Sequence, residues 1–138
     1  MGQQYPYKGS SAGMSSCIDD CDRCNRVCWN MALNYCLDRG GEHSEAAHIR
    51  MLLGCAEVCR TTASLMLSGF SLHAIMCGAC ADICDTCADD CERIGDMDEC
   101  VTVCRSCAES CREMVRSQAA TNQVLETQGF GASATNRL

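Results

Sequence analysis

The sequence has few large side chains with which to fill a protein interior. Aromatic residues make up only 4% of its 138 residues, with one Trp and two Phe. Cys, Ala and Met must therefore fill much of any core. No apolar run approaches the roughly 18 residues that a membrane-spanning helix needs, so no membrane partner is expected.

Positive charge is also scarce. Eleven Lys and Arg residues stand against 18 Asp and Glu residues, which gives a net charge of −7. This balance argues against a nucleic-acid partner, because phosphate binding depends mainly on Lys and Arg. Residues 1–16 lack the apolar stretch of a secretory signal peptide. We therefore expect a cytoplasmic protein.

Catalytic patterns are missing as well. The sequence shows no nucleophile paired with a base, no phosphate-binding loop and no suggestive pair of carboxylates. Acidic residues such as Asp19, Asp82 and Asp90 are typical of a solvated outer face. We do not expect an enzyme.

Cysteine, in contrast, is abundant, with 16 residues. From Cys77 to Cys91 the steps between cysteines are 3, 4, 3, 4, and from Cys100 to Cys111 they are 4, 3, 4. Alternating steps of 3 and 4 place residues on one face of an α-helix, whereas a strand would need a period of 2. The cysteines thus occupy the positions that Leu, Ile and Val fill in an ordinary helical bundle.

The pattern predicts four helices joined by short turns. Ser16 is the expected N-cap of the first helix. The predicted ranges are 17–39, 44–67, 72–93 and 97–120. Helices of this length form an all-α, antiparallel up-down-up-down four-helix bundle with a Cys-lined core. We expect this bundle to cover residues 16–120, between a flexible arm at 1–15 and a flexible tail at 121–138.

Disulfides are a poor explanation for so many cysteines. Two Cys residues three or four positions apart on one helix rarely reach disulfide geometry without distorting the backbone. Disulfide-rich scaffolds are also rich in loops, whereas these cysteines keep a helical period. Free thiols in a reducing cytosol fit the pattern better.

Sulfur is a soft ligand, and thiolates select Cu(I), zinc and iron–sulfur clusters over hard cations. Structural zinc sites and iron–sulfur clusters use sets of four ligands, commonly supplied by loops. Cu(I) accepts two or three thiolates, and one thiolate can bridge two ions, so a column of thiols along rigid helices suits Cu(I). A zinc-buffering protein and a thiol-redox protein remain the alternatives, the latter because C-x2-C pairs occur.

The candidate metal ligands are all the cysteines. They are Cys17, Cys21, Cys24, Cys28, Cys36, Cys55, Cys59, Cys77, Cys80, Cys84, Cys87, Cys91, Cys100, Cys104, Cys107 and Cys111. Cys36 is expected to lie off the stripe of the first helix, toward its edge. Thioethers bind Cu(I) weakly and imidazoles moderately, so both suit transient relay. Candidate uptake ligands are Met66, His73 and Met114 at one end of the bundle, and His48 near the other.

The sequence resembles the Cys-rich four-helix-bundle copper storage proteins of the cytosolic type. The resemblance covers residues 17–118 and rests on three C-x3-C-x2-C-x3-C runs, at 17–28, 80–91 and 100–111, with Cys55, Cys59 and Cys77. It implies a core that holds many Cu(I) ions, a homotetramer of bundles, and uptake through an end rich in Met or His.

Overall fold

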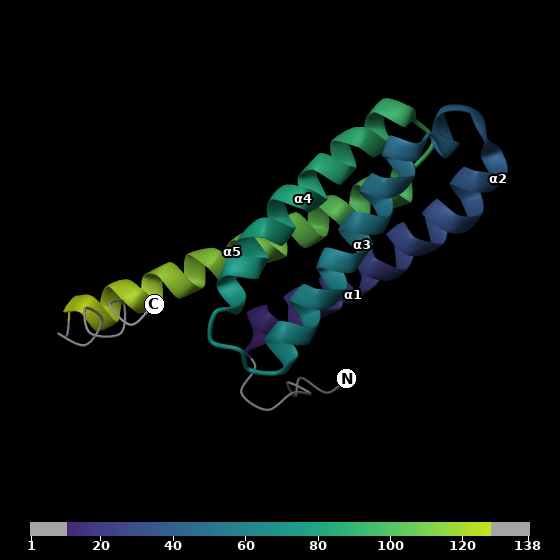
Figure 1. Cartoon of the computed structure of the whole chain (residues 1–138). Helices are drawn as coiled ribbons and strands as arrows, with labels where there is room; N and C mark the ends of the chain where they lie inside the picture. Colours follow the sequence, from purple (N-terminus) through teal and green to yellow (C-terminus); the bar gives the residue numbers. More distant parts are fainter. Residues whose placement is uncertain (1–10, 128–138) are drawn as a thin grey trace.

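The computed structural model of the protein describes residues 11–127, and every regular element in that range is helical. One continuous helix contains α1, a π-helical turn and α2, and three further long helices follow (Figure 1). The bounds are Ala12–Asn30 for α1, Met31–Cys36 for the π-helical turn, Leu37–Arg39 for α2, Ala46–Leu67 for α3, His73–Ile94 for α4 and Asp98–Thr127 for α5. This confirms the predicted all-α four-helix bundle.

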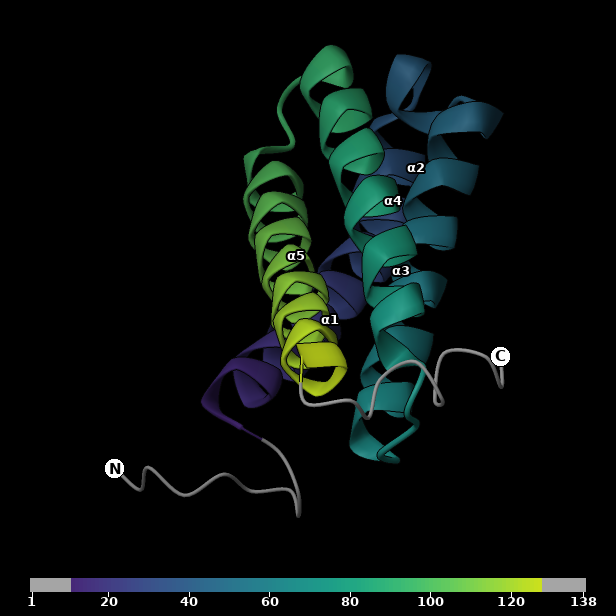
Figure 2. The same ribbon diagram turned by 90° about the vertical axis from the view of Figure 1, so that its left-hand side faces the viewer.

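The four long helices pack side by side around a common interior (Figures 1 and 2). α1 contacts α3 and α5, and α4 contacts the same two helices, which closes a ring of four. Low-numbered residues of one helix meet high-numbered residues of its neighbour, as the sulfur contacts of Cys17 with Cys111, Cys28 with Cys104, Cys55 with Cys84 and Cys59 with Cys80 show. In these two pairs, α1 with α5 and α3 with α4, the helices run antiparallel.

The first and last helices are longer than predicted. α1 begins at Ala12, because Ser11 has an extended backbone and its Oγ accepts a hydrogen bond from the Met14 amide at 3.2 Å. Ser11, and not Ser16, is therefore the N-cap. α5 continues to Thr127, beyond the rest of the bundle (Figure 1). Residues 12–15 and 121–127, which we expected in the flexible arm and tail, are helical, and residues 1–10 and 128–138 lie outside the described range.

The prediction for Cys36 was wrong. Cys36 is fully buried, although it follows Cys28 by eight residues and an α-helix would turn it about 80° away from the stripe. The π-helical turn at Met31–Cys36 removes this mismatch. A π turn accommodates about one extra residue. Cys36 therefore takes the angular position that a residue seven places after Cys28 has in a regular α-helix, and it returns to the core.

The turns at the Cys36 end of the bundle are tied together. The carboxylate of Asp96, in the α4–α5 turn, pairs with Arg39 at 2.7 Å, and the Asp96 carbonyl accepts a hydrogen bond from Tyr35 at 3.0 Å. His43 Nε2 donates to the carbonyl of Gly95 at 3.0 Å. These contacts fasten the loop between α2 and α3 over the turn between α4 and α5.

We expect the reduced protein to be strongly helical without metal. Zinc-finger domains unfold without metal because the ion supplies their folding free energy. Here the buried core includes Ile18, Leu52 and Met97, and neutral Cys packs as a small apolar group. Circular dichroism in reductant should show a helical spectrum that changes little when Cu(I) is added. A coil-like spectrum of the metal-free chain would contradict this view of the core.

Candidate metal centre

The thiols form the interior of the bundle. All 16 cysteines are free, and each is at most 1% exposed. The helical period of the sequence explains this burial, because each stripe lies on the face that its helix turns toward the other three. The thiols are therefore shielded from solvent and from redox reagents dissolved in it, while they remain close together.

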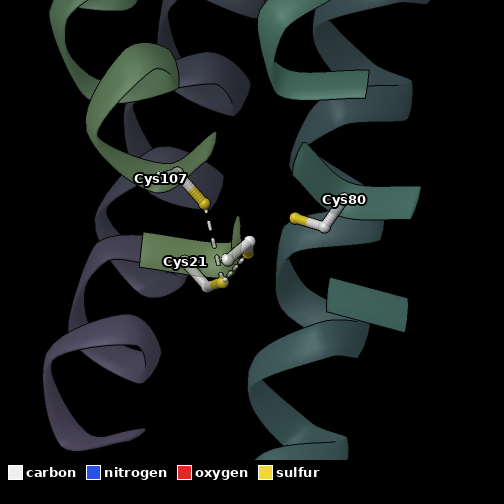
Figure 3. A group of neighbouring side chains, drawn as sticks. Cys21, Cys80 and Cys107 are labelled. Atoms are coloured by element: carbon white, nitrogen blue, oxygen red, sulfur yellow. Dashed lines mark hydrogen bonds between the residues drawn. The ribbon is translucent and has the colours of Figure 1, made fainter. Parts of the chain in front are cut away.

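The sulfur atoms lie close enough to share a metal ion. The Sγ–Sγ separations of neighbouring thiols run from 3.5 Å, between Cys59 and Cys84, to 3.9 Å, between Cys21 and Cys111. Figure 3 shows Cys21, Cys80 and Cys107 pointing into the same space from α1, α4 and α5, and the sulfur atoms of Cys21 and Cys107 are 3.6 Å apart. With metal–sulfur bonds of about 2.3 Å, two sulfurs on one trigonal ion lie about 4.0 Å apart. The metal-free spacing is already close to that value.

The thiols fall into groups that overlap. In each group the sulfur atoms all lie within 4.8 Å of one another. The groups are Cys21, Cys80, Cys107 and Cys111; Cys24, Cys28, Cys55 and Cys104; Cys24, Cys55, Cys59 and Cys84; Cys59, Cys80, Cys84 and Cys107; and Cys17, Cys77 and Cys111. Most members belong to two groups, so the core is a continuous network and not a set of separate sites.

The few thiols of α3 do not interrupt this network. α3 carries only Cys55 and Cys59, but each belongs to two of the overlapping groups. Cys55 lies 3.7 Å from Cys84, and Cys59 lies within 3.8 Å of Cys80, Cys84 and Cys107. Two central cysteines are thus enough for α3 to complete the middle of the core.

The surroundings of the thiols favour their neutral form at several positions. Burial, and then the repulsion that an ionised Cys91 would exert, raise the pKa of Cys36 from 9.0 to about 11, against the opposing effect of Arg39. Hydrogen bonds with Cys107 and other neighbours, followed by burial, raise the pKa of Cys59. A metal ion must therefore displace protons from these thiols when it binds.

His48 meets two sulfur ligands at the Cys36 end. Its Nε2 lies 3.5 Å from Cys36 Sγ and 3.2 Å from Met97 Sδ, and its Nδ1 lies 2.6 Å from a carboxylate oxygen of Asp90. Asp90, which we expected on the solvated face, is only 19% exposed and also pairs with Arg93. Burial alone would raise the pKa of Asp90, but hydrogen bonds from His48 and Arg93 hold it below its ordinary value.

Sequence reasoning missed Met97. It lies in the turn directly before α5 and is 1% exposed. Two signals could have found it: its apolar side chain stands between Asp96 and Asp98, and it precedes Cys100 by three residues, a step that extends the Cys stripe of α5 backwards. A buried position for a lone apolar residue in an acidic turn is a reasonable expectation, but the sequence gives no indication of its partners.

The candidate uptake ligands at the opposite end are only partly brought together. Met66 is 2% exposed, and its Sδ lies 3.9 Å from Cys77 Sγ, so it does adjoin the thiol core. Met114 is 8% exposed. His73 is half-buried, and its Nδ1 donates to the carbonyl of Phe70 at 2.7 Å, so this nitrogen is engaged with the turn and not with a thiol.

None of the helices in the described part of the chain combines the length and the hydropathy needed to cross a bilayer. The fold and the core together define a class of protein: a four-helix bundle with clusters of buried cysteine thiols suited to metal binding. In this bundle the thiols stand on the long helices and not on loops.

Comparison with known proteins identifies the family. The family described as "Csp: Copper storage protein" matches residues 10–116, and the chain belongs to it. The crystal structure of the Nmul_A1745 protein from Nitrosospira multiformis is similar, with 48% sequence identity and a TM-score of 0.75 over 78% of this chain and 98% of that one. A search of curated proteins finds no significant match. The family resemblance in the sequence is confirmed.

The pKa of Cys36 predicts how stability depends on pH. Because the folded pKa, about 11, lies above the ordinary value of 9.0, the folded state favours the neutral thiol. The stability that the folded state gains by burying Cys36 as a neutral thiol is fully present below pH 9 and is lost as pH rises from 9 through 11. Urea unfolding of the metal-free, reduced protein should show this loss, and Cys36→Ala should have a flatter profile. Parallel profiles for the two proteins would contradict the assignment.

Proposed function

We propose that the protein binds and stores multiple Cu(I) ions through the Cys thiolates that line its core. The observation that carries the proposal is the overlap of the thiol groups, in which residues such as Cys24 and Cys59 have neighbours on both sides along the bundle. A thiolate placed in this way can bridge two Cu(I) ions. Sites of this kind can be stacked along the part of the bundle axis that these groups occupy.

Overlapping groups favour Cu(I) over zinc. A structural zinc ion takes four ligands in a closed tetrahedral site, so neighbouring zinc ions compete for thiols that belong to two groups. Cu(I) needs only two or three soft ligands. Zinc buffering and thiol-redox chemistry are the two alternatives. The redox alternative is supported by sulfur pairs such as Cys28 and Cys104, which lie 3.6 Å apart across helices.

Charge balance also supports a high capacity. An isolated thiolate in a protein interior is strongly unfavourable, so the metal-free thiols are expected to be neutral. Each Cu(I) displaces about one proton, and with bridging ligands the filled core approaches one ion per thiolate. The buried charge then stays near zero, and many ions can be held together.

The remaining expectations follow from the family. We propose that copper is cargo and that the protein has no catalytic activity. We also propose a cytoplasmic location, where reducing conditions keep thiols free, and a homotetramer. Trp29, Leu33 and Leu37, all on the first helix, are between 39% and 48% exposed. They are suitable for a contact between copies of the chain.

We propose that copper enters at the end of the bundle with Met66, His73 and Met114. The contact between Met66 Sδ and Cys77 Sγ supports this assignment, because it offers a step from a thioether to the first thiol. His73 is half-buried, whereas His48 at the opposite end is fully buried beneath a fastened loop. Weak ligands at an accessible end suit passage better than storage.

The storage proposal predicts a high copper stoichiometry. Reduced protein titrated with Cu(I) against a competing chelator should bind on the order of one ion per Cys, well over ten per chain, because thiolates are shared. Saturation at about four ions or fewer would exclude storage. A redox protein should instead take few Cu(I) ions and form a reversible disulfide.

The uptake route predicts a kinetic effect without a change in capacity. Replacement of Met66, His73 and Met114 together by Leu should slow Cu(I) uptake, because the relay ligands are lost, while the thiol core still fills. Stopped-flow mixing with a Cu(I)–chelator complex measures the rate, and a long incubation measures the capacity. His48→Leu is the control at the other end. If only that variant takes up copper slowly, the route runs through the opposite end.

A further inference from the structure

A second type of metal-ligand cluster lies at the Cys36 end, apart from the groups made of thiols alone. It consists of one thiol, one imidazole and one thioether, from Cys36, His48 and Met97. Their donor atoms are 3.2 Å, 3.5 Å and 3.8 Å apart, and each residue is at most 1% exposed. A thioether can be buried without a hydrogen bond or a metal ion. A buried imidazole, in contrast, needs a partner for each of its two ring nitrogens.

The spacing of the three donors fits one ion with three ligands. Taking about 2.3 Å for a metal–sulfur bond and about 2.0 Å for a metal–nitrogen bond, donors around a trigonal ion lie about 3.7 to 4.0 Å apart. The observed triangle is smaller by only a few tenths of an ångström on most sides. An ion can therefore enter after a small outward movement of the donors, without a change in the backbone.

The partner of His48 presents the correct nitrogen to this space. Asp90 accepts a hydrogen bond from Nδ1 at 2.6 Å and is itself held by Arg93 at 2.8 Å. With the proton on Nδ1, the lone pair of Nε2 points toward Cys36 and Met97. A carboxylate that orients a histidine through its second nitrogen is a recurrent feature of metal sites and also raises the basicity of the ligand.

The backbone is shaped to assemble the cluster. The π-helical turn brings Cys36 into the core, and π turns inside α-helices are frequent at functional sites. His48 continues the Cys stripe of α3, since residues 48, 52, 55 and 59 have the same 4, 3, 4 steps as the cysteine runs of the other helices. The edge of the His43 ring packs against the His48 ring, with centroids 6.4 Å apart, and covers this end.

We propose that Cys36, His48 and Met97 form a separate Cu(I) site of mixed nitrogen and sulfur ligands, with Asp90 as the residue that orients His48. The inference rests on the proposed function for the identity of the metal. One thiolate, one neutral imidazole and one thioether around one monovalent ion give zero net charge, so this site needs no bridging thiolate to be buried. Soft ligands favour Cu(I), and the lack of a fourth donor among them disfavours zinc.

The first test uses the unmodified chain and the three histidines as probes. Full-length protein with ¹⁵N-labelled His is reduced, and Cu(I) is added stepwise without oxygen. Long-range ¹H–¹⁵N spectra should show a shift of His48 Nε2, while His43 Nε2, which donates to the carbonyl of Gly95, keeps its position. If the core fills while the His48 signals do not move, the site does not exist.

The second test uses variants and a competing Cu(I) chelator. His48→Gln should bind one equivalent fewer than the unmodified chain, because the amide cannot replace the imidazole. Asp90→Asn should weaken that same equivalent about 10- to 100-fold, the usual effect of an orienting residue on metal affinity. Asp89→Asn, the same substitution at a neighbouring carboxylate that is 71% exposed and pairs with Arg105, should leave the titration unchanged. A His48→Gln curve identical to that of the unmodified chain would overturn the proposal.

The two proposals fail in different ways. If the chain takes up about one Cu(I) and His48 shifts, copper storage is wrong but the mixed site stands. If the chain takes up more than ten and His48 does not shift, storage stands and the mixed site is wrong. A response of His48 to Zn²⁺ but not to Cu(I) also overturns the inference. Circular dichroism of each variant establishes that it has folded. The NMR test uses the unmodified chain, so it does not depend on the folding of any variant.

Discussion

The structure depends on the two chemical states of the cysteine thiol. In its neutral form a thiol packs like a small apolar side chain and makes only weak hydrogen bonds, so a core can be built from many of them. In its ionised form it is a strong ligand for soft metals and is unfavourable in an apolar interior without a counter-charge. The same residues, such as Cys59 and Cys84 at 3.5 Å, can therefore hold the empty bundle together and supply ligands to copper.

Most of the thiol core could be predicted because it obeys one regular period. Extending the α3 stripe from Cys55 and Cys59 in steps of 3 and 4 leads to His48, to Met51 or Leu52, to Thr62 and to Met66, and all of these are buried except Met51, which is partly buried. Cys36 could not be placed in the same way. A period of about 100° per residue assumes an unbroken α-helix, and no residue type in Met31–Cys36 announces a π turn. The packing of Cys36 into the core therefore overrides the α-helical period of the local sequence.

Contacts between segments distant in sequence were also beyond prediction. Asp90 precedes Cys91 and looked like part of a solvated surface, but its carboxylate bonds to a histidine 42 residues away. Met97 precedes Cys100 by one step of the Cys period, so its burial could be expected, but its contact with His48 on another helix could not. The N-cap was missed for a different reason, since Ser11 and Ser16 are chemically equal and only the backbone conformation distinguishes them. The family resemblance established the type of core but not these local contacts.

The ends of a thiol-lined bundle pose a problem that its middle does not have. In the middle, four helices surround each point and a thiolate can be shared between ions above and below it. At an end, one of those directions is lost, so a terminal ion has fewer shared thiolates within reach. α3 has Leu52, which is not a ligand, and then His48 at the next step of its stripe. A neutral imidazole and a thioether beside Cys36 would complete the coordination of a terminal ion without adding negative charge, which is the physical argument for a different donor set at this end of the bundle.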